Sequence, residues 1–283
     1  MPAVHFSPSI SPRVALVTGA TNGIGHAVAR LLLAEGMTVI VHGPTPETVE
    51  AARERLILAG YDPARIETEA ADFTRLAEVS ALADRVAARH PGLDVLVNDA
   101  ATAGSDTRTV TEDGHELIHQ VNYLAPYLLT RRLWDALGAP DQSRIVNLSS
   151  SLHRTANLNW GDLDRAKNYS RTGAYAQSKL ALTMFTRAAA AIGGQRILAV
   201  SVHPGIVNSG LLPLYSRTGA PVSEAALAVA RLCSPSTTLA DGAYYDGQAQ
   251  APVATLVDDH KAVVRLWKAS AKAVGLDREP QAA

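Results

Sequence analysis

Short runs of apolar residues alternate along this chain with longer segments whose apolar residues recur at helical spacing. The runs are five to seven residues long and rich in valine, leucine and isoleucine, which is typical of strands buried on both faces. Strands are predicted at residues 13–18, 37–42, 65–71, 93–98, 144–149 and 196–202. Helices are predicted at residues 23–35, 46–59, 75–89, 111–137 and 173–192, with a closing helix at 258–272 whose apolar contacts are Val264, Leu266 and Trp267.

The regular alternation of strand and helix predicts an α/β protein. Strands joined by helices form βαβ units, and these build a doubly wound, Rossmann-type parallel sheet with helices on both faces. No internal repeat or shift in composition divides the chain, so residues 13–283 are predicted to form a single domain. Residues 1–12, rich in proline and serine, are predicted to be a flexible N-terminal arm.

Two connections, at residues 151–172 and 204–221, are longer than the others between the predicted strands and helices. Long connections after parallel strands are where α/β proteins build substrate sites. We therefore expect Leu152, His153 and Leu211 to contact the substrate. The neighbouring Trp160 and leucines suggest an apolar ligand, unless these side chains only pack the loops onto the domain.

The balance of charge and the single cysteine narrow the possible functions. The chain has 26 basic and 27 acidic residues and no long basic run, so neither a nucleic acid nor an anionic membrane is expected as a partner. Cys233 is the only cysteine, which excludes an intrachain disulfide and a cysteine metal cluster. No signal peptide or membrane-spanning run is visible, and a cytoplasmic protein is predicted.

Two motifs in the sequence indicate a binding or catalytic function. The stretch TGATNGIG (18–25) follows the first strand and opens the first helix, where small residues let the backbone approach a pyrophosphate and turn helix N–H groups toward it. The stretch YAQSK places Tyr175 and Lys179 on one helix face, and a nearby cation lowers the pKa of a phenol. Taken singly, a glycine turn can be purely structural, and a Tyr and a Lys can lie on an ordinary solvated helix.

Together, in this order and with a serine at the end of the fifth strand, the motifs resemble those of the short-chain dehydrogenases/reductases. The resemblance covers about residues 12–272 and includes Asp72-Phe73, NDAA (98–101) and PGIVNS (204–209). RIVNLSSS, the enlarged loop and AYYDG are similar to the retinol-dehydrogenase-like branch and its bacterial relatives. The resemblance implies an oxidoreductase that moves a hydride between a nicotinamide cofactor and a carbonyl or alcohol group.

The resemblance also implies the roles of individual residues. Tyr175 would be the general acid-base, Ser150 would hydrogen-bond to the substrate oxygen, Lys179 would lower the Tyr175 pKa and hold the ribose, and Asn122 would anchor a water. The predicted cofactor contacts are Gly19, Thr21, Asn22, Gly23, Ile24, Gly25, Gly43, Thr45, Asp72, Phe73, Asn98, Ala100, Tyr175, Lys179, Pro204, Gly205, Val207 and Ser209.

Three positions differ from the common pattern of the family. Asp99 and Ala101 replace Asn and Gly in the Asn-Asn-Ala-Gly stretch, and Asp99 cannot donate the hydrogen bonds of an amide. Ser209 stands where many relatives have Thr, and it keeps the hydroxyl.

The residues at the end of the second strand, His42-Gly43-Pro44-Thr45, bear on the choice of dinucleotide. They offer neither the acid that favours NAD nor the arginine that favours NADP. With no acid to repel a 2′-phosphate, and with Thr45 or His42 available to bind it, we expect NADP, with NAD as the alternative.

The stretch HELIH (115–119) has the His-Glu-x-x-His spacing of zinc proteases. The third zinc ligand of the known patterns is missing, since Asn122 and Ala125 occupy the metzincin positions and the next Glu is Glu224. We therefore interpret His115 and His119 as packed side chains on the helical face of Asn122, satisfied by local partners, and predict no metal.

An alternative function and the state of association are also open at the level of sequence. A non-catalytic, cofactor-sensing regulator is the alternative function, although such proteins often lose the Tyr or the Lys. Family oligomers commonly pair the long helices after the fourth and fifth strands. The enlarged loop could cover that face, so a monomer and a homodimer are both predicted.

Overall fold

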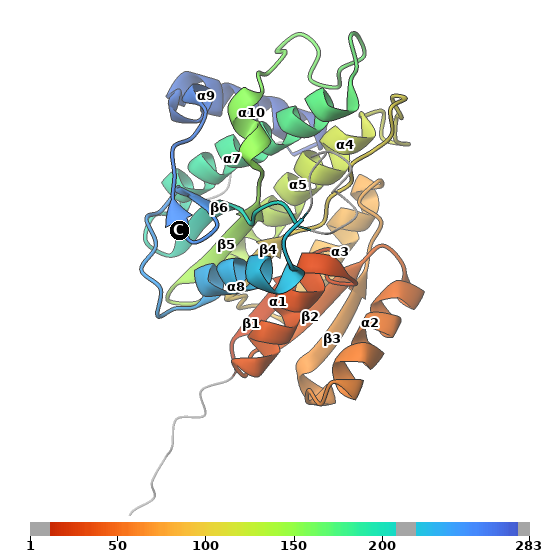
Figure 1. The fold of residues 1–283 in the computed structure, drawn as a ribbon, viewed down its shortest axis with the longest axis vertical. Helices are drawn as coiled ribbons and strands as arrows, with labels where there is room; N and C mark the ends of the chain where they lie inside the picture. Colours follow the sequence, from red (N-terminus) through yellow and green to blue (C-terminus); the bar gives the residue numbers. More distant parts are fainter. Residues whose placement is uncertain (1–11, 208–218, 277–283) are drawn as a thin grey trace, which may run out of the picture.

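A computed structural model describes residues 12–207 and 219–276. Its centre is an eight-stranded sheet in the order β3-β2-β1-β4-β5-β6-β7-β8, parallel except for β8, which pairs antiparallel with β7 (Figure 1). The strands are β1 (Val14–Val17), β2 (Thr38–Gly43), β3 (Ile66–Ala70), β4 (Val95–Asn98), β5 (Ser143–Leu148), β6 (Ile197–His203), β7 (Tyr244–Asp246) and β8 (Ala249–Gln250).

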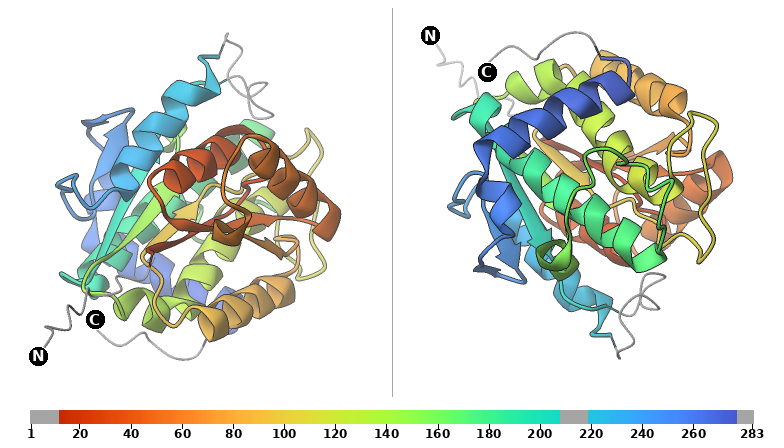
Figure 2. Two further views of the ribbon diagram at one scale, coloured as in Figure 1. Left: turned by 90° about the horizontal axis from the view of Figure 1, so that it is seen from below. Right: turned by 90° about the horizontal axis from the view of Figure 1, so that it is seen from above.

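Helices cover both faces of the sheet, as the two end views show (Figure 2). On one face lie α1 (Gly23–Ala34), α2 (Pro46–Leu58) and α8 (Val222–Cys233). On the other lie α3 (Leu76–Arg89), α5 (Ala125–Arg132) and α7 (Arg171–Gly193), with α10 (His260–Ala273) packed outside α7. The shorter elements are η1 (Pro63–Arg65), α4 (Leu117–His119), the π-helix η2 (Gln120–Leu124), α6 (Trp134–Gly138), η3 (Ser151–Thr155) and α9 (Thr255–Asp258).

The strand side chains divide between two apolar cores. Leu16, Ile40 and Leu96 point to the core beneath α3, α5 and α7, whereas the adjacent Val17, Val41 and Val97 point to the core beneath α1, α2 and α8. Each of these side chains is fully buried. Burying one such side chain contributes roughly 1.5–3 kcal/mol, so both helical layers are needed to hold the sheet.

The predicted α/β fold with a doubly wound parallel sheet is confirmed. Each of the six predicted strands lies within two residues of its predicted bounds at both ends. Strands β7 and β8 and helix α8 were not predicted from the sequence, and Val264, expected as an apolar contact of the closing helix, is exposed. Strands from Val14 to Gln250 share one sheet, which supports a single domain over 13–283, although that division remains a prediction.

The helix predicted at residues 111–137 is wrong in its first part. Gly114 has a φ of 87°, and Val110 forms an antiparallel bridge with Glu116, so the chain is not helical there. The helix begins at Leu117, and the Glu116 carboxylate accepts the N–H groups of Ile118 and His119 as its cap. Residues 111–116 (TEDGHE) hold no apolar residue, so the apolar spacing supports a helix only from Leu117 onward.

Within 12–207 and 219–276, no helix is both long and apolar enough to cross a membrane. Ser209 and Leu211, predicted to contact cofactor and substrate, lie outside these ranges, as do residues 1–11 of the predicted arm.

Candidate active site

A groove of about 690 Å³ lies at the carboxyl ends of β1 to β4. Strand order reverses between β1 and β4, and ligands of doubly wound sheets bind at this switch point. Nine of the predicted cofactor residues line the groove, namely Gly19, Thr21, Asn22, Gly23, Ile24, Gly43, Asp72, Phe73 and Ala100. It is also lined by His42, Asp99 and Ala101, which the sequence had brought into question, and by residues that were not predicted, among them Thr102, Ala103, Gly104, Leu117 and Val121.

The glycine turn leaves room for a close backbone approach. Gly19 has a φ of 66°, and a Cβ there would lie 2.8 Å from the Ala100 Cα, so a side chain would collide with the turn after β4. Asn22 is the N-cap of α1 and makes no side-chain cap with the residues that the structure describes. Asn22 therefore does not block the first N–H groups of α1, of which only that of Gly25 bonds the Asp99 carboxyl, and such a helix end fits the pyrophosphate of a dinucleotide.

His42 links the backbone segments that follow β1 and β3 and does not serve as a ligand for a phosphate. Its Nδ1 accepts the Gly19 N–H at 3.3 Å, and its Nε2 donates to the Ala71 carbonyl at 3.1 Å. Its ring lies 4.5 Å from that of Phe73, and burial lowers its pKa to about 4. The hypothesis that His42 could bind a 2′-phosphate is therefore wrong, because both ring nitrogens are engaged and the ring is neutral.

Arg55, which was not among the predicted site residues, reaches the glycine turn at Thr21. Arg55 on α2 donates from Nη2 to the Thr21 carbonyl, and a Cβ on Gly43 would lie 2.2 Å from the Thr21 Cγ2. Arg55 thus contacts Thr21, and Thr21 in turn lies against the end of β2. Thr45, by contrast, caps α2 by accepting the Thr48 N–H, and it does not line the groove.

Tyr175 and Lys179 lie on the buried face of α7, which Ser170 caps by accepting the Gly173 N–H. The Lys179 Nζ is 5.5 Å from the centre of the Tyr175 ring and donates to the Leu148 carbonyl at 2.8 Å. Burial lowers the pKa of Lys179 to about 8, and the nearby Asp99 carboxyl opposes that shift. The spacing predicted from sequence therefore places the phenol and the ammonium together beside the carboxyl end of β5.

Ser150 follows β5 and is held by its neighbours. Its hydroxyl accepts the Leu152 N–H, and its carbonyl accepts a bond from the His153 Nδ1 at 2.7 Å. His153 is fully buried, with Nε2 accepting the Ala254 N–H and its ring 4.5 Å from Tyr244. Substrate contact by His153 stays a prediction, but this geometry fits a positioning role for Ser150 better. Ser149 is bonded to Thr183 and Lys179 in the interior.

Asn122 is in the π-helix η2 and joins two segments near α7. Its Oδ1 accepts the Thr102 N–H at 2.8 Å, and its Nδ2 donates to the Thr102 carbonyl and to the Ser178 hydroxyl. Asn122, Ser150, Tyr175 and Lys179 are each at most 3% exposed. All four predicted catalytic residues therefore lie beneath the surface, next to the groove rather than along its open wall.

The remaining predicted contacts differ in their positions. The Asn98 side chain is buried and donates to Asn147 and Thr130, so any cofactor contact there would come from its backbone. Gly25 is buried in the first turn of α1. Leu152 packs against Tyr175, as a substrate contact would. After β6 come Pro204, Gly205 and Val207; Gly205 has a φ of 95°, and Val207 bridges Ala220.

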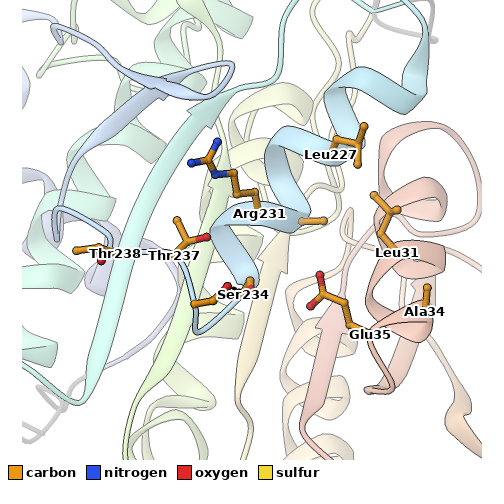
Figure 3. A pocket seen from close by; sticks show the side chains of 10 residues that line it. Leu31, Ala34, Glu35, Leu227, Arg231, Ser234, Thr237 and Thr238 are labelled. Carbon is orange, nitrogen blue, oxygen red and sulfur yellow. Dashed lines mark hydrogen bonds between the residues drawn. The ribbon is translucent and has the colours of Figure 1, made fainter.

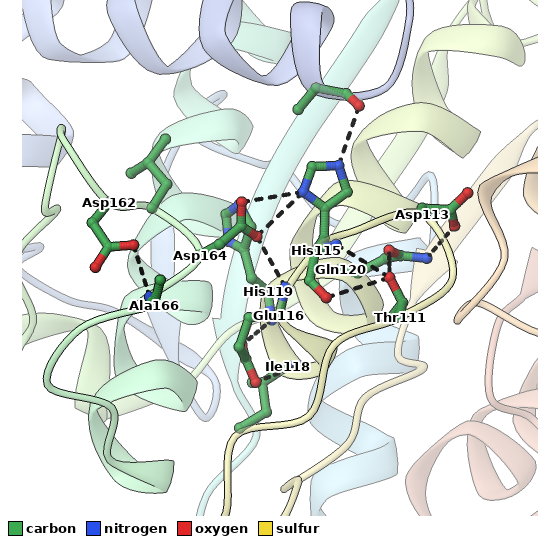
Figure 4. Close-up of polar contacts among 12 residues, drawn as sticks. Thr111, Asp113, His115, Glu116, Ile118, His119, Gln120, Asp162, Asp164 and Ala166 are labelled. Carbon is green, nitrogen blue, oxygen red and sulfur yellow. Dashed lines mark hydrogen bonds and ion pairs between the residues drawn. The ribbon is translucent and has the colours of Figure 1, made fainter.

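HELIH does not present two histidines on one helical face (Figure 4). His115 precedes the helix; its Nδ1 is 3.2 Å from the Asp164 carboxylate, and its Nε2 bonds the Ala273 carbonyl. His119 is buried, and its Nδ1 has no hydrogen-bond partner among the described residues. The expectation of local partners therefore holds for His115 but is wrong for this atom of His119. Nowhere in residues 12–207 and 219–276 do three His, Cys, Asp or Glu side chains gather as a metal site would require.

A second groove, of about 810 Å³, lies between α1 and α8 (Figure 3). It is lined by Leu31, Glu35, Leu227, Arg231 and the loop after α8. These residues come from the ends of the two helices, at the amino edge of the sheet. None of the predicted site residues lines this groove, so it is not the candidate active site.

Comparisons with known proteins identify the family of this chain. The sequence profile described as short chain dehydrogenase matches residues 13–217. Mouse retinol dehydrogenase 13 is 32% identical over 95% of this chain and 85% of its own. A protein of Streptomyces sp. (strain C5) with the provisional name daunorubicin C-13 ketoreductase is 33% identical over 96% of each chain.

Solved structures agree with the fold. A protein from Mycobacterium paratuberculosis is 28% identical and superposes with a TM-score of 0.76 over 93% of both chains. An actinorhodin polyketide ketoreductase solved with NADPH has a TM-score of 0.65 over 83% of this chain and 95% of its own, and at 23% identity it shows the fold alone. The chain therefore belongs to the short chain dehydrogenases, and it is a nicotinamide-dependent oxidoreductase of carbonyl or alcohol groups.

Proposed function

We propose that this protein is an NADPH-dependent reductase of apolar ketones or aldehydes, which also runs in the oxidative direction on the corresponding alcohols. The observation that carries this proposal is the pairing of Tyr175 with Lys179 beside the carboxyl end of β5, the strand that Ser150 follows. Tyr175 and Lys179 come from one face of α7, and Ser150 follows β5, all next to the dinucleotide groove.

Each of these residues has a role that its surroundings support. Tyr175 gives a proton to the carbonyl oxygen, or removes one in the oxidative direction. Ser150 donates a hydrogen bond to the same oxygen as negative charge develops there, from a backbone that His153 holds in place. Lys179 lies beside the phenol as a cation and favours its ionised form. The nicotinamide, when bound, supplies the hydride.

The preference for NADP rests on charge around the end of β2. No acid follows β2, so nothing there repels a 2′-phosphate or favours a free 2′-hydroxyl. Arg55 adds a guanidinium next to Thr21, and a guanidinium fork suits a phosphate. Thr45 stays a weaker proposal, because its hydroxyl already caps α2.

The apolar substrate is supported by side chains around Tyr175. Leu152 and Tyr169 come from the enlarged loop and pack with Ile118 and Ala174 against the phenol ring. Relatives are named for the substrates retinol and polyprenol, which are largely hydrocarbon. A cytoplasmic location and a monomeric or homodimeric state stay predictions.

A panel of apolar and polar ketones, aldehydes and alcohols, each assayed with NADPH and NADH by absorbance at the nicotinamide band, tests the proposal. We expect turnover of apolar carbonyls with NADPH. Cofactor binding without turnover of any compound would instead favour the non-catalytic regulator.

A further inference from the structure

Asp99 occupies a fixed position in the dinucleotide groove. It follows β4, and its N–H and that of Ala100 both donate to the Thr18 hydroxyl, at 3.0 and 3.1 Å. The residue is half-buried and lines the groove, so the rest of its surface faces the space that a dinucleotide would fill. A bound cofactor would therefore cover this carboxyl.

The carboxyl of Asp99 lies at the start of α1. It accepts a hydrogen bond from the Gly25 N–H, which belongs to the first turn of that helix. A Cβ on Gly25 would lie 2.6 Å from the Asp99 Oδ2, so the two residues are in close contact. The first turn of α1 is also where a pyrophosphate binds in this kind of fold. An acidic side chain of the chain itself is thus placed next to the site for an anionic ligand.

The second neighbour of Asp99 is Lys179, which attracts it. Burial raises the pKa of Asp99 to about 7, and the Lys179 charge and the Gly25 N–H oppose that shift. The charge of Lys179 favours the ionised carboxylate as long as both groups are charged. Near neutral pH, Asp99 can therefore be either charged or neutral at little cost, and its neighbours decide which form prevails.

A dinucleotide adds negative charge to this cluster. Its pyrophosphate at the first turn of α1 would repel an ionised Asp99 and would also compete for Lys179. We propose that Asp99 takes up a proton when the dinucleotide binds, so that cofactor affinity is coupled to pH. The proton comes from bulk solvent and forms an O–H bond on the carboxylate, with no other bond changed. This inference rests on the proposed use of a nicotinamide cofactor.

The sign of the effect follows from linkage. Affinity is highest where Asp99 is already neutral and falls as pH rises through its pKa, by up to about tenfold per pH unit for one proton taken up. His42 and His26 face the same region from β2 and α1, but their pKa values lie below 6.5, so they are neutral in this range. Lys179 and Tyr175 face it from α7, and the loss of the Lys179 charge at higher pH would also weaken binding.

Calorimetric titration with NADP+ at pH 8, in two buffers of different ionisation enthalpy, counts the protons exchanged. We expect the unaltered protein to take up protons when NADP+ binds. Asp99→Asn keeps the shape of the side chain but cannot titrate, so it should take up fewer protons, by up to about one. Asp241→Asn is the matched control, since Asp241 is another carboxyl with a raised pKa and does not line the groove. It should leave uptake unchanged.

Infrared difference spectra separate Asp99 from Lys179, since Lys179 has no carboxyl. Binding of NADP+ should produce a protonated-carboxyl band that is absent in Asp99→Asn and present in Asp241→Asn. Equal proton uptake with and without Asp99, or no such band in the unaltered protein, would overturn the coupling alone. If the unaltered protein bound neither NADP+ nor NADPH, the proposed function would fall together with the coupling.

Discussion

Single histidines in this chain illustrate how burial decides the chemistry of a residue. Burial lowers the pKa of both His42 and His153, and each ring bonds two backbone groups through its two nitrogens. A neutral imidazole can serve as donor at one nitrogen and acceptor at the other, which is what these bonds require. Both rings therefore connect segments of backbone, and neither is an acid-base group at neutral pH.

Tyr175 is the residue on which the chemistry depends most. Tyr175→Phe removes the proton that the phenol transfers and preserves the packing of the ring against Ile118 and Leu152. We expect turnover to fall by at least about a hundredfold, because positioned acid-base catalysis supplies that much. The affinity for NADPH should stay nearly unchanged, as measured by fluorescence titration. Near-normal turnover of a true substrate by this variant would contradict the mechanism.

Arg55 provides a separate test of cofactor preference. Arg55→Ala should weaken NADPH binding by about tenfold and leave NADH binding unchanged, because only NADPH carries the 2′-phosphate. The control is Arg53→Ala, since Arg53 lies on the same helix but pairs with Glu50. Fluorescence titration with both cofactors measures the effect. Equal losses for NADPH and NADH would show that Arg55 only supports the glycine turn.

The parts of the site that follow from sequence are those made by near neighbours. The glycine turn and the Tyr175–Lys179 pair are each set within one strand-to-helix turn or one helix, so their spacing is enough to predict them. The contact between Asp99 and Gly25, and that between Arg55 and Thr21, join residues far apart in the chain. No local pattern records such a pairing, so it could not be predicted.

At the scale of elements, the start of α4 shows why the predicted helix began too early. Residues 111–116 (TEDGHE) hold no apolar residue, and the Glu116 carboxylate caps the N–H groups of Ile118 and His119. A side chain that bonds the backbone in this way competes with helix formation upstream of itself. The chain before Glu116 turns instead, and His115 faces the enlarged loop.

His115 links that loop to α10 by hydrogen bonds. Its ring bonds Asp164 and the Ala273 carbonyl at the end of α10, and the Asp164 carboxylate raises the pKa of His115. A raised pKa in the folded state means that this stabilisation is fully present below about 6.5 and is lost as pH rises through the folded value. The pKa of Asp164 is lowered in turn, so its contribution is lost only when the pH falls into the acidic range.

We therefore expect His115→Gln to destabilise the protein more at pH 6 than at pH 8. The difference should be about 1 kcal/mol or less, since the pair is partly exposed, and should appear as a shift of a few degrees in the melting midpoint. His260→Gln, at an exposed site, is the control and should show no such difference. A loss that is the same at both pH values would mean that His115 acts by packing and not by charge.

For the whole molecule, the parallel sheet could be predicted because its inner strands are buried on both faces and read as continuous apolar runs. The edge could not. β7 has three residues and β8 two, and they are ordered by pairing with β6 and with each other. Such short strands have too few residues for any pattern to distinguish them from a loop.

The closing helix α10 packs over α5 and α7. Trp267 on α10 lies 5.2 Å from the Tyr127 ring of α5 and 5.9 Å from the Phe185 ring of α7, and the Tyr127 hydroxyl donates to its carbonyl. Ser270 bonds Tyr123 at 2.6 Å. The face of α5 and α7 that family relatives commonly pair is therefore covered by α10. The enlarged loop was expected to be what covers it.

We accordingly expect no tetramer built on that face. The chain weighs 29.8 kDa, and light scattering should find a particle of one chain, or of two joined through another surface. Trp267→Ala should remove the largest side chain of the α10 contact and cost roughly 3–5 kcal/mol of stability, while Lys268→Ala, at the exposed neighbour, should cost little. If α10 blocks association, Trp267→Ala should also form larger particles under conditions where Lys268→Ala does not. A stable tetramer of the unaltered protein would mean that α10 moves away from α7 in solution.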